Sequence, residues 1–134
     1  MWPPPVEDVA AVFRAAGVDA RLEELPPGEE GYPGVAVRVE AFRCDGRLVI
    51  ALVPADGEAV DPRRLGCTNA NPVDPPPFPF SDAFVAIEQS LFNERTVWIE
   101  AGSPRHVAGL SPVHLARLVR ARSGDFGATA GGHG

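Results

Sequence analysis

Residues 101–106, AGSPRH, combine a glycine turn with side chains that could serve a reaction. Gly102 and Ser103 should end a strand, and their freed backbone N–H groups could bind a ligand oxygen on which negative charge develops. His106 could act near neutral pH as an acid, a base or a hydrogen-bond donor. The alternative interpretation is a plain β-turn fixed by Pro104, in which His106 caps a neighbouring carbonyl.

The Ser103 hydroxyl is a weak candidate for a nucleophile. The spacing implies no Ser-His-acid arrangement, and Pro104 follows directly, unlike the strand-to-helix turn that exposes a nucleophilic serine. We therefore expect backbone donors, and not this hydroxyl, to carry the chemistry.

Arg38 lies in an alternating stretch, VAVRVEAF, at residues 35–42. Alternation puts Arg38 and Glu40 on one face of the strand. Arg38 either pairs with Glu40 or points into a pocket, where its fork of donors would grip a phosphate or a carboxylate. Because arginine stays charged, it cannot serve as a general base. We predict that Arg38 lies on the pocket wall opposite the turn at residues 101–106.

Basic residues also follow the last predicted helix. His114, Arg117 and Arg120 form a stripe, and Arg105 is expected nearby. Such a stripe could steer the end of an RNA, although a solvated helix face is the alternative. The formal charge of −6 argues against broad basic surfaces, but it allows a local patch.

The groups above must be positioned by helices and strands. Because the expected helices and strands do not strictly alternate along the chain, their order predicts an α+β domain. The first helix, residues 5–17, has an apolar stripe at i, i+3, i+4 and i+7. The hairpin of residues 35–42 and 48–53 turns at Asp45-Gly46, and its second strand should be central in a sheet. Further strands are expected at 20–25, 83–88 and 96–101, a short helix at 61–65, an extended loop at 66–80 and a last helix at 111–123.

The 134 residues suffice for one domain, expected at 1–122, followed by a flexible glycine-rich tail at 123–134. No apolar run is long enough to span a membrane, and no secretory signal is visible. A cytoplasmic protein is expected. Cys44 and Cys67 have no metal-type spacing and are interpreted as reduced thiols.

Four segments together resemble a known family: VRVEAFRCDGRLVIALVPAD, VDPRRL, EQSLFNERTVWIEAGSPRH and GLSPVHLARL. Their order is similar to that of the aminoacyl-tRNA deacylases of the YbaK/ProX type, also found as editing domains inserted in prolyl-tRNA synthetases. The resemblance implies a mixed, barrel-like β-sheet flanked by helices. It implies a cytoplasmic hydrolase for translation fidelity, which cleaves the ester at the aminoacylated 3′ end of a mischarged tRNA without metal or cofactor.

The residue patterns and the resemblance together give a candidate site with two groups of residues. Those expected to be catalytic are Arg38, Gly102, Ser103 and His106, and those expected to bind substrate are Glu40, Glu88, Arg105, Arg117 and Arg120.

The chain also departs from the family. Arg38 stands where family members carry a lysine, Glu100 stands where a glycine is common, and the segment between Leu65 and Phe84 is short. One alternative is therefore a diverged protein whose pocket binds a small acid or acyl ligand, or serves another reaction in a biosynthetic pathway. A structural interaction module, favoured only by the proline-rich loop, is a third interpretation.

Overall fold

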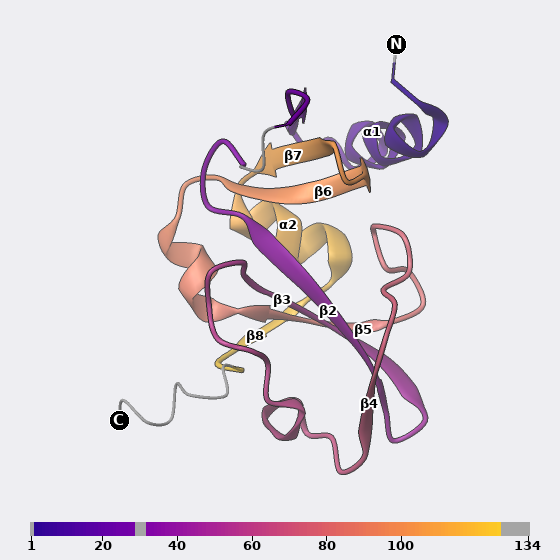
Figure 1. Ribbon diagram of the computed structural model, residues 1–134, viewed down its shortest axis with the longest axis vertical. Helices are drawn as coiled ribbons and strands as arrows, with labels where there is room; N and C mark the ends of the chain where they lie inside the picture. Colours follow the sequence, from indigo (N-terminus) through magenta and orange to yellow (C-terminus); the bar gives the residue numbers. More distant parts are fainter. Residues whose placement is uncertain (1, 29–31, 127–134) are drawn as a thin grey trace.

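The computed structural model describes residues 2–28 and 32–126, whose elements form two β-sheets and two α-helices (Figure 1). In chain order the elements are α1 (Pro4–Ala16), β1 (Arg21–Glu24), β2 (Val37–Cys44), β3 (Arg47–Pro54), the 3₁₀ helix η1 (Pro62–Leu65), β4 (Ala70–Val73), β5 (Phe84–Glu88), the 3₁₀ helix η2 (Gln89–Asn93), β6 (Val97–Ser103), β7 (His106–Leu110), α2 (Pro112–Val119) and β8 (Arg122–Gly124). The α+β class is confirmed. The described strands form two sheets, which an isolated bridge between Ala36 and Trp98 links but which do not close into a barrel.

The larger sheet has the strand order β4-β2-β3-β5-β8. The predicted hairpin is confirmed as β2 and β3, which pair antiparallel around the turn at Asp45-Gly46. β3 is the central strand, as its continuous apolar run indicated, and β5 pairs with it in parallel.

β4 lies within a segment predicted to be an extended loop. It forms an edge strand against the end of β2. The Asp45 carboxylate fixes the two residues before β4, because it accepts hydrogen bonds from the Thr68 and Asn69 N–H groups at 2.9 and 2.7 Å. Sequence reasoning missed β4 because its four residues, ANPV, include proline and asparagine, which are depleted in strands, although proline is tolerated at a sheet edge.

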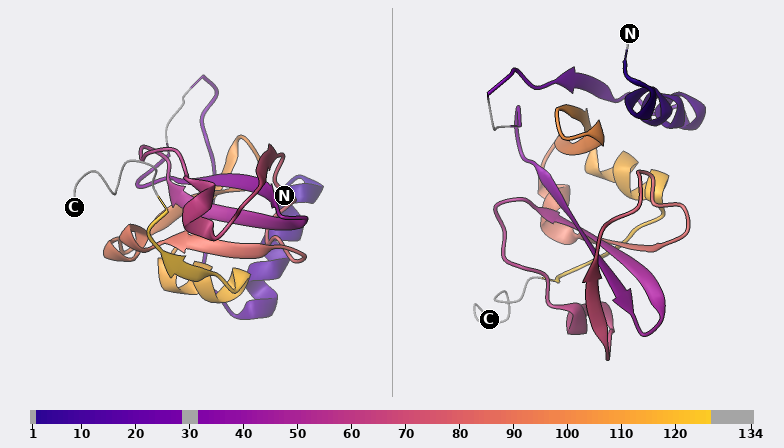
Figure 2. Two further views of the ribbon diagram at one scale, coloured as in Figure 1. Left: turned by 90° about the horizontal axis from the view of Figure 1, so that it is seen from below. Right: turned by 45° about the vertical axis from the view of Figure 1, so that its right-hand side comes forward.

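The smaller sheet has the order β1-β7-β6 and is antiparallel throughout. β6 and β7 form a hairpin whose two-residue turn is Pro104 and Arg105, so the segment AGSPRH is a strand end, a turn and a strand start. In Figure 1 and the right-hand view of Figure 2, α1 lies at one end of the molecule, beyond β6 and β7, and β4 lies at the other.

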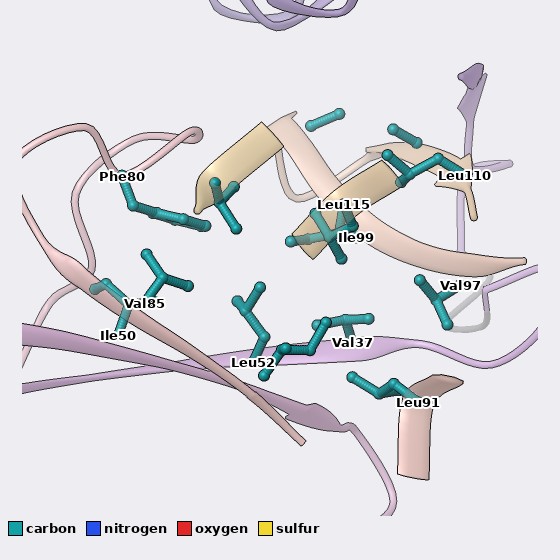
Figure 3. Packing of buried hydrophobic residues seen from close by; sticks show 14 of the residues in the cluster. Val37, Ile50, Leu52, Phe80, Val85, Leu91, Val97, Ile99, Leu110 and Leu115 are labelled. Atoms are coloured by element: carbon teal, nitrogen blue, oxygen red, sulfur yellow. The ribbon is translucent and has the colours of Figure 1, made fainter. Parts of the chain in front are cut away.

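The main core fills the space between the sheets. Figure 3 shows Ile50 and Leu52 of β3 on one side, Val97 and Ile99 of β6 on the other, and Leu115 of α2 among them. These five side chains are at most 1% exposed. The predicted stripe of α1 is confirmed, since its buried residues are Val6, Val9, Ala10 and Phe13. None of the described helices has the length and apolar character needed to cross a membrane.

The C-terminal boundaries differ from expectation. α2 ends at Val119 and not at residue 123, because Arg120 adopts the left-handed conformation, at φ 57°. The chain then forms β8 against β5, and Phe126 is buried. Residues 123–126 therefore belong to the fold and not to a tail. The rest of the expected tail, residues 127–134, lies outside the described residues.

The expectation of two reduced thiols is wrong, because Cys44 and Cys67 form a disulfide. Asp61 caps η1 as predicted, and Gly66 ends it in a left-handed conformation. That turn brings Cys67 back to the end of β2, where the two Cα atoms are 5.3 Å apart. The sequence separation of 23 residues gave no indication of this approach.

Candidate functional site

The main pocket has a volume of about 720 Å³ and lies between α1, the start of β2, the proline-rich segment 75–80 and the end of β6. Its polar lining consists of Asp8 from α1, Tyr32, Arg38 from β2, and Glu100 and Gly102 from β6. The remaining lining is valine, proline and phenylalanine. A pocket of this size, largely apolar with a few polar groups, is typical of a small-molecule site.

Arg38 lines this pocket, and its guanidinium donors are bonded to protein oxygens. Nε donates to Glu40 Oε2 at 2.9 Å, and Nη2 lies 2.8 Å from the same oxygen. The other donors reach the backbone carbonyls of Ala55, Gly57 and Glu58 at 2.8 to 3.3 Å. Arg38 thereby fixes the loop after β3, and a ligand would have to displace one of these oxygens to bond the guanidinium.

Gly102 also lines the pocket, and its conformation requires glycine. Its φ is +92°, and a Cβ built there would lie 2.6 Å from the Pro5 carbonyl carbon and oxygen. The β6–β7 register shifts between Glu100 and Ser103, so Gly102 has no counterpart on β7. The bulge therefore lets α1 pack on β6 and frees this residue from the strand ladder.

Ser103 and His106 form a pair that sequence reasoning did not predict. Ser103 Oγ lies 2.6 Å from His106 Nδ1 and accepts a hydrogen bond from the Arg105 N–H at 3.1 Å. His106 is 7% exposed, and its ring meets that of Trp2 edge-on. The sequence pattern that could have predicted this pair is the spacing Ser-x-x-His across a two-residue hairpin turn. Neither Ser103 nor His106 is among the described residues that line the main pocket.

The predicted substrate-binding residues lie in different places. Glu40 pairs with Arg38. Arg105 donates to the Leu25 carbonyl at 2.6 Å. Arg117 and Arg120 lie on α2 and at its end, and neither is among the residues that line the main pocket in the described chain.

Glu88 lies at the end of β5, away from the main-pocket residues found in the described chain. Its Oε2 accepts a hydrogen bond from the Phe126 N–H at 2.8 Å. Burial raises the pKa of Glu88 above its ordinary value, and the hydrogen bond only partly opposes this. Glu88 therefore fastens the C-terminal segment to β5.

Asp8 and Tyr32 were not predicted, and Glu100 was noted only as a departure from the family. Among residues 2–28 and 32–126, neither Asp8 nor Glu100 makes an ion pair or a side-chain hydrogen bond. Burial and the negative charge of Glu100 raise the pKa of the Tyr32 hydroxyl. The sequence could have indicated Glu100 as a pocket residue, because Glu100 and Gly102 share one face of β6. With Arg38 paired to Glu40, the carboxylates of Asp8 and Glu100 have no cationic partner within the described part of the chain.

The described part of the chain brings no three His, Cys, Asp or Glu side chains together as metal ligands. The polar groups of the main pocket can accept a cation, donate a backbone N–H to an oxygen, and hold a water beside a carboxylate.

The fold is similar to that of solved structures. One is a proposed trans-editing enzyme for prolyl-tRNA synthetase, with a TM-score of 0.78 and 17% identity over 95% of this chain and 99% of that one. Another comes from work on epitope grafting onto scaffold proteins, with a TM-score of 0.75 and 18% identity over 95% and 99%. A proposed signal-transduction protein from Marinobacter aquaeolei gives a TM-score of 0.68 and 13% identity, over 94% of this chain and 31% of that one.

The sequence matches no protein-family model and no curated protein. At the identities of the structural neighbours, the likeness shows the fold alone. The chain shares an α+β fold with a proposed editing enzyme and has a pocket where β2, β6 and α1 meet.

Proposed function

We propose that this protein is a hydrolase of the aminoacyl-tRNA deacylase type, which cleaves the ester between an amino acid and the terminal ribose of a mischarged tRNA. The observation that carries the proposal is the main pocket, which joins Arg38 and Gly102 on a fold similar to that of a proposed trans-editing enzyme. The sequence segments that resemble the deacylase family contribute both residues.

The unpaired carboxylates suggest how the substrate is oriented. Asp8 comes from α1 and Glu100 from β6, so the pocket attracts a cation between two elements. The α-ammonium group of an esterified amino acid is such a cation. The valine and phenylalanine side chains of the pocket would hold an apolar amino-acid side chain.

The reaction needs one water molecule and no cofactor. Water adds to the ester carbonyl carbon, and its proton passes through a pocket carboxylate to the ribose oxygen as the ester C–O bond breaks. The N–H of Gly102, a residue with no Cα counterpart on β7, donates to the carbonyl oxygen as negative charge develops there. Arg38 is a positioning residue in this scheme, because it holds Glu40 and the loop at 55–58.

The charge of the pocket disfavours the alternative of a small free acid. A carboxylate ligand would face Asp8 and Glu100, and like charges at close range disfavour binding. It would also find the donors of Arg38 already bonded. An ester has no such negative charge.

A panel of mischarged tRNAs tests the proposal. Ester loss is followed with the protein, without it, and with Glu100→Gln, and Glu94→Gln serves as a matched control because Glu94 is exposed and lies outside the described pocket lining. We expect at least one aminoacyl-tRNA to be hydrolysed faster than in the no-enzyme control, with a rate about tenfold lower for Glu100→Gln, or ~1.4 kcal/mol of transition-state stabilisation. Loss of no ester from any member of the panel would refute the proposal.

A further inference from the structure

A second pocket, here called the basic pocket, has a volume of about 400 Å³. It lies where the start of β1, the start of β6, the end of β7 and the start of α2 meet. Its basic residues are Arg21, Arg95 and His114, with Asp19 as the acid. Thr96 and Ser111 contribute hydroxyl groups.

The basic pocket offers donors that the rest of the described chain does not use. Arg95 makes no ion pair and no side-chain hydrogen bond with any residue in 2–28 or 32–126. Arg21 pairs only with Glu23 among those residues, at 3.1 Å and with its own side chain 78% exposed. The Ser111 oxygen accepts from two backbone N–H groups, which leaves its hydroxyl hydrogen free to donate. Arginine and hydroxyl donors together suit a phosphate.

Both pockets lie along one face of β6. Val97, Ile99 and Ala101 face the main core, so the alternate residues lie on the opposite face of β6, where Trp98 is itself buried. Trp98 lines the basic pocket, and Glu100 and Gly102 line the main pocket. In Figure 1, β6 runs from the short helical turn η2 towards α1, so the two pockets follow one another along the strand. Thr96 and Gly102 are separated by about 20 Å at ~3.3 Å per residue.

The two pockets have opposite charge. The main pocket holds Asp8 and Glu100, which pair with no residue of the described chain, and the basic pocket holds Arg95 and Arg21 with one acid, Asp19. A ligand that is cationic at one end and anionic further along would match this arrangement. An RNA that carries an amino acid on its 3′ end has this polarity, with an ammonium group at the end and backbone phosphates behind it.

We propose that the basic pocket binds a backbone phosphate of the RNA whose 3′-terminal ester occupies the main pocket. This inference rests on the proposed function. It assigns RNA contact to Arg95, which lies just before β6, and to Arg21 of β1, and not to the predicted stripe of Arg117 and Arg120. Of that stripe, His114 lies in the basic pocket.

The test measures binding of an uncharged RNA hairpin with a single-stranded 3′ end, at several salt concentrations. Arg95→Gln is compared with Arg117→Gln, since Arg117 is also exposed but lies on α2 outside the basic pocket. We expect Arg95→Gln to weaken binding. It should also reduce the slope of log affinity against log salt concentration by about 1, since one fewer phosphate is neutralised. Arg117→Gln should leave both unchanged. An unchanged affinity and slope for Arg95→Gln would overturn the proposal, as would the reverse pattern in the two variants.

A second arm of the experiment distinguishes an RNA phosphate from the phosphate of a free nucleotide. Adenosine monophosphate is added as a competitor, and we expect it to displace the RNA only at concentrations at least about tenfold above those of competing RNA, because it offers a single phosphate. Displacement at equal concentration would overturn the assignment to RNA in favour of a free nucleotide.

A third arm separates this inference from the proposed function. An amino acid ethyl ester, which has no phosphate, should be cleaved at the same rate by the parent protein and by Arg95→Gln. If neither this ester nor any mischarged tRNA is cleaved by either protein, the proposed function fails, whereas loss of RNA binding by Arg95→Gln alone still supports the phosphate site.

Discussion

Replacing Gly102 by alanine is expected to destabilise the protein by about 2 to 5 kcal/mol, from two separate penalties. The φ of +92° is unfavourable for any residue with a Cβ, which costs roughly 1–2 kcal/mol. The new Cβ would also lie 2.6 Å from the Pro5 carbonyl carbon and oxygen and 2.8 Å from the Val6 nitrogen. Because these are backbone atoms of α1, they cannot rotate away, and overpacking adds roughly 1–3 kcal/mol.

Gly17→Ala isolates the first penalty. Gly17 has a φ of +67° and no atom within 4 Å of a built Cβ, so it should lose only about 1–2 kcal/mol. The free energy of unfolding is measured for the parent protein and both variants by urea denaturation, with the slope held common. Gly102→Ala should exceed Gly17→Ala by about 1–3 kcal/mol. Equal losses would refute the inference that Gly102 is required by the packing of α1 on β6.

Three further outcomes are expected. Glu88→Gln should raise the stability of the protein at neutral pH. Because the folded state raises the pKa of Glu88 above its ordinary 4.5, ionisation of this carboxyl destabilises the fold as pH rises, and glutamine does not ionise. The gain should vanish in acid, and thermal unfolding at both pH values checks it. Asp45→Asn should lower stability at neutral pH and converge with the parent in acid, because hydrogen bonds from backbone N–H groups lower the pKa of Asp45 below 3.8; parallel acid titrations check this, and a constant difference would contradict it. Replacing Cys44 and Cys67 by serine should cost about 3 kcal/mol in urea unfolding, the value for a loop of roughly this length, and no loss would contradict the stabilising role of the disulfide.

Much of the architecture could be predicted because its signals are local. The stripe of α1, the Asp-Gly turn of the hairpin and the apolar run of β3 each fall within a few residues, and all three are confirmed. The separation into two sheets was not predicted. It depends on which strands pair, and no local pattern determines that.

The elements that were missed depend on distant partners. β4 forms because the Asp45 carboxylate and the disulfide bring residues 67–69 to the end of β2. β8 forms because α2 ends early at Arg120 and Glu88 then holds the Phe126 N–H. Neither contact leaves a mark in the composition of the segment itself.

The candidate site shows the same division. Arg38 and Gly102 were expected on one pocket, and both line it. The partners of Arg38 at residues 55–58 and the approach of α1 to Gly102 could not be predicted, because both arise from segments distant in sequence. Asp8 was missed for this reason, since nothing within α1 indicates that its first turns face a pocket.

The central claim is that the main pocket cleaves aminoacyl esters that it holds by their ammonium group. The most direct measurement is the hydrolysis rate of an aminoacylated RNA hairpin with a free amine and of the same RNA with the amine acetylated, each with the parent protein and with Glu100→Gln. We expect the parent protein to cleave the free-amine ester at least about tenfold faster than the acetylated one, and Glu100→Gln to lose most of that difference. Equal rates for the two esters, or hydrolysis no faster than without protein, would contradict the claim.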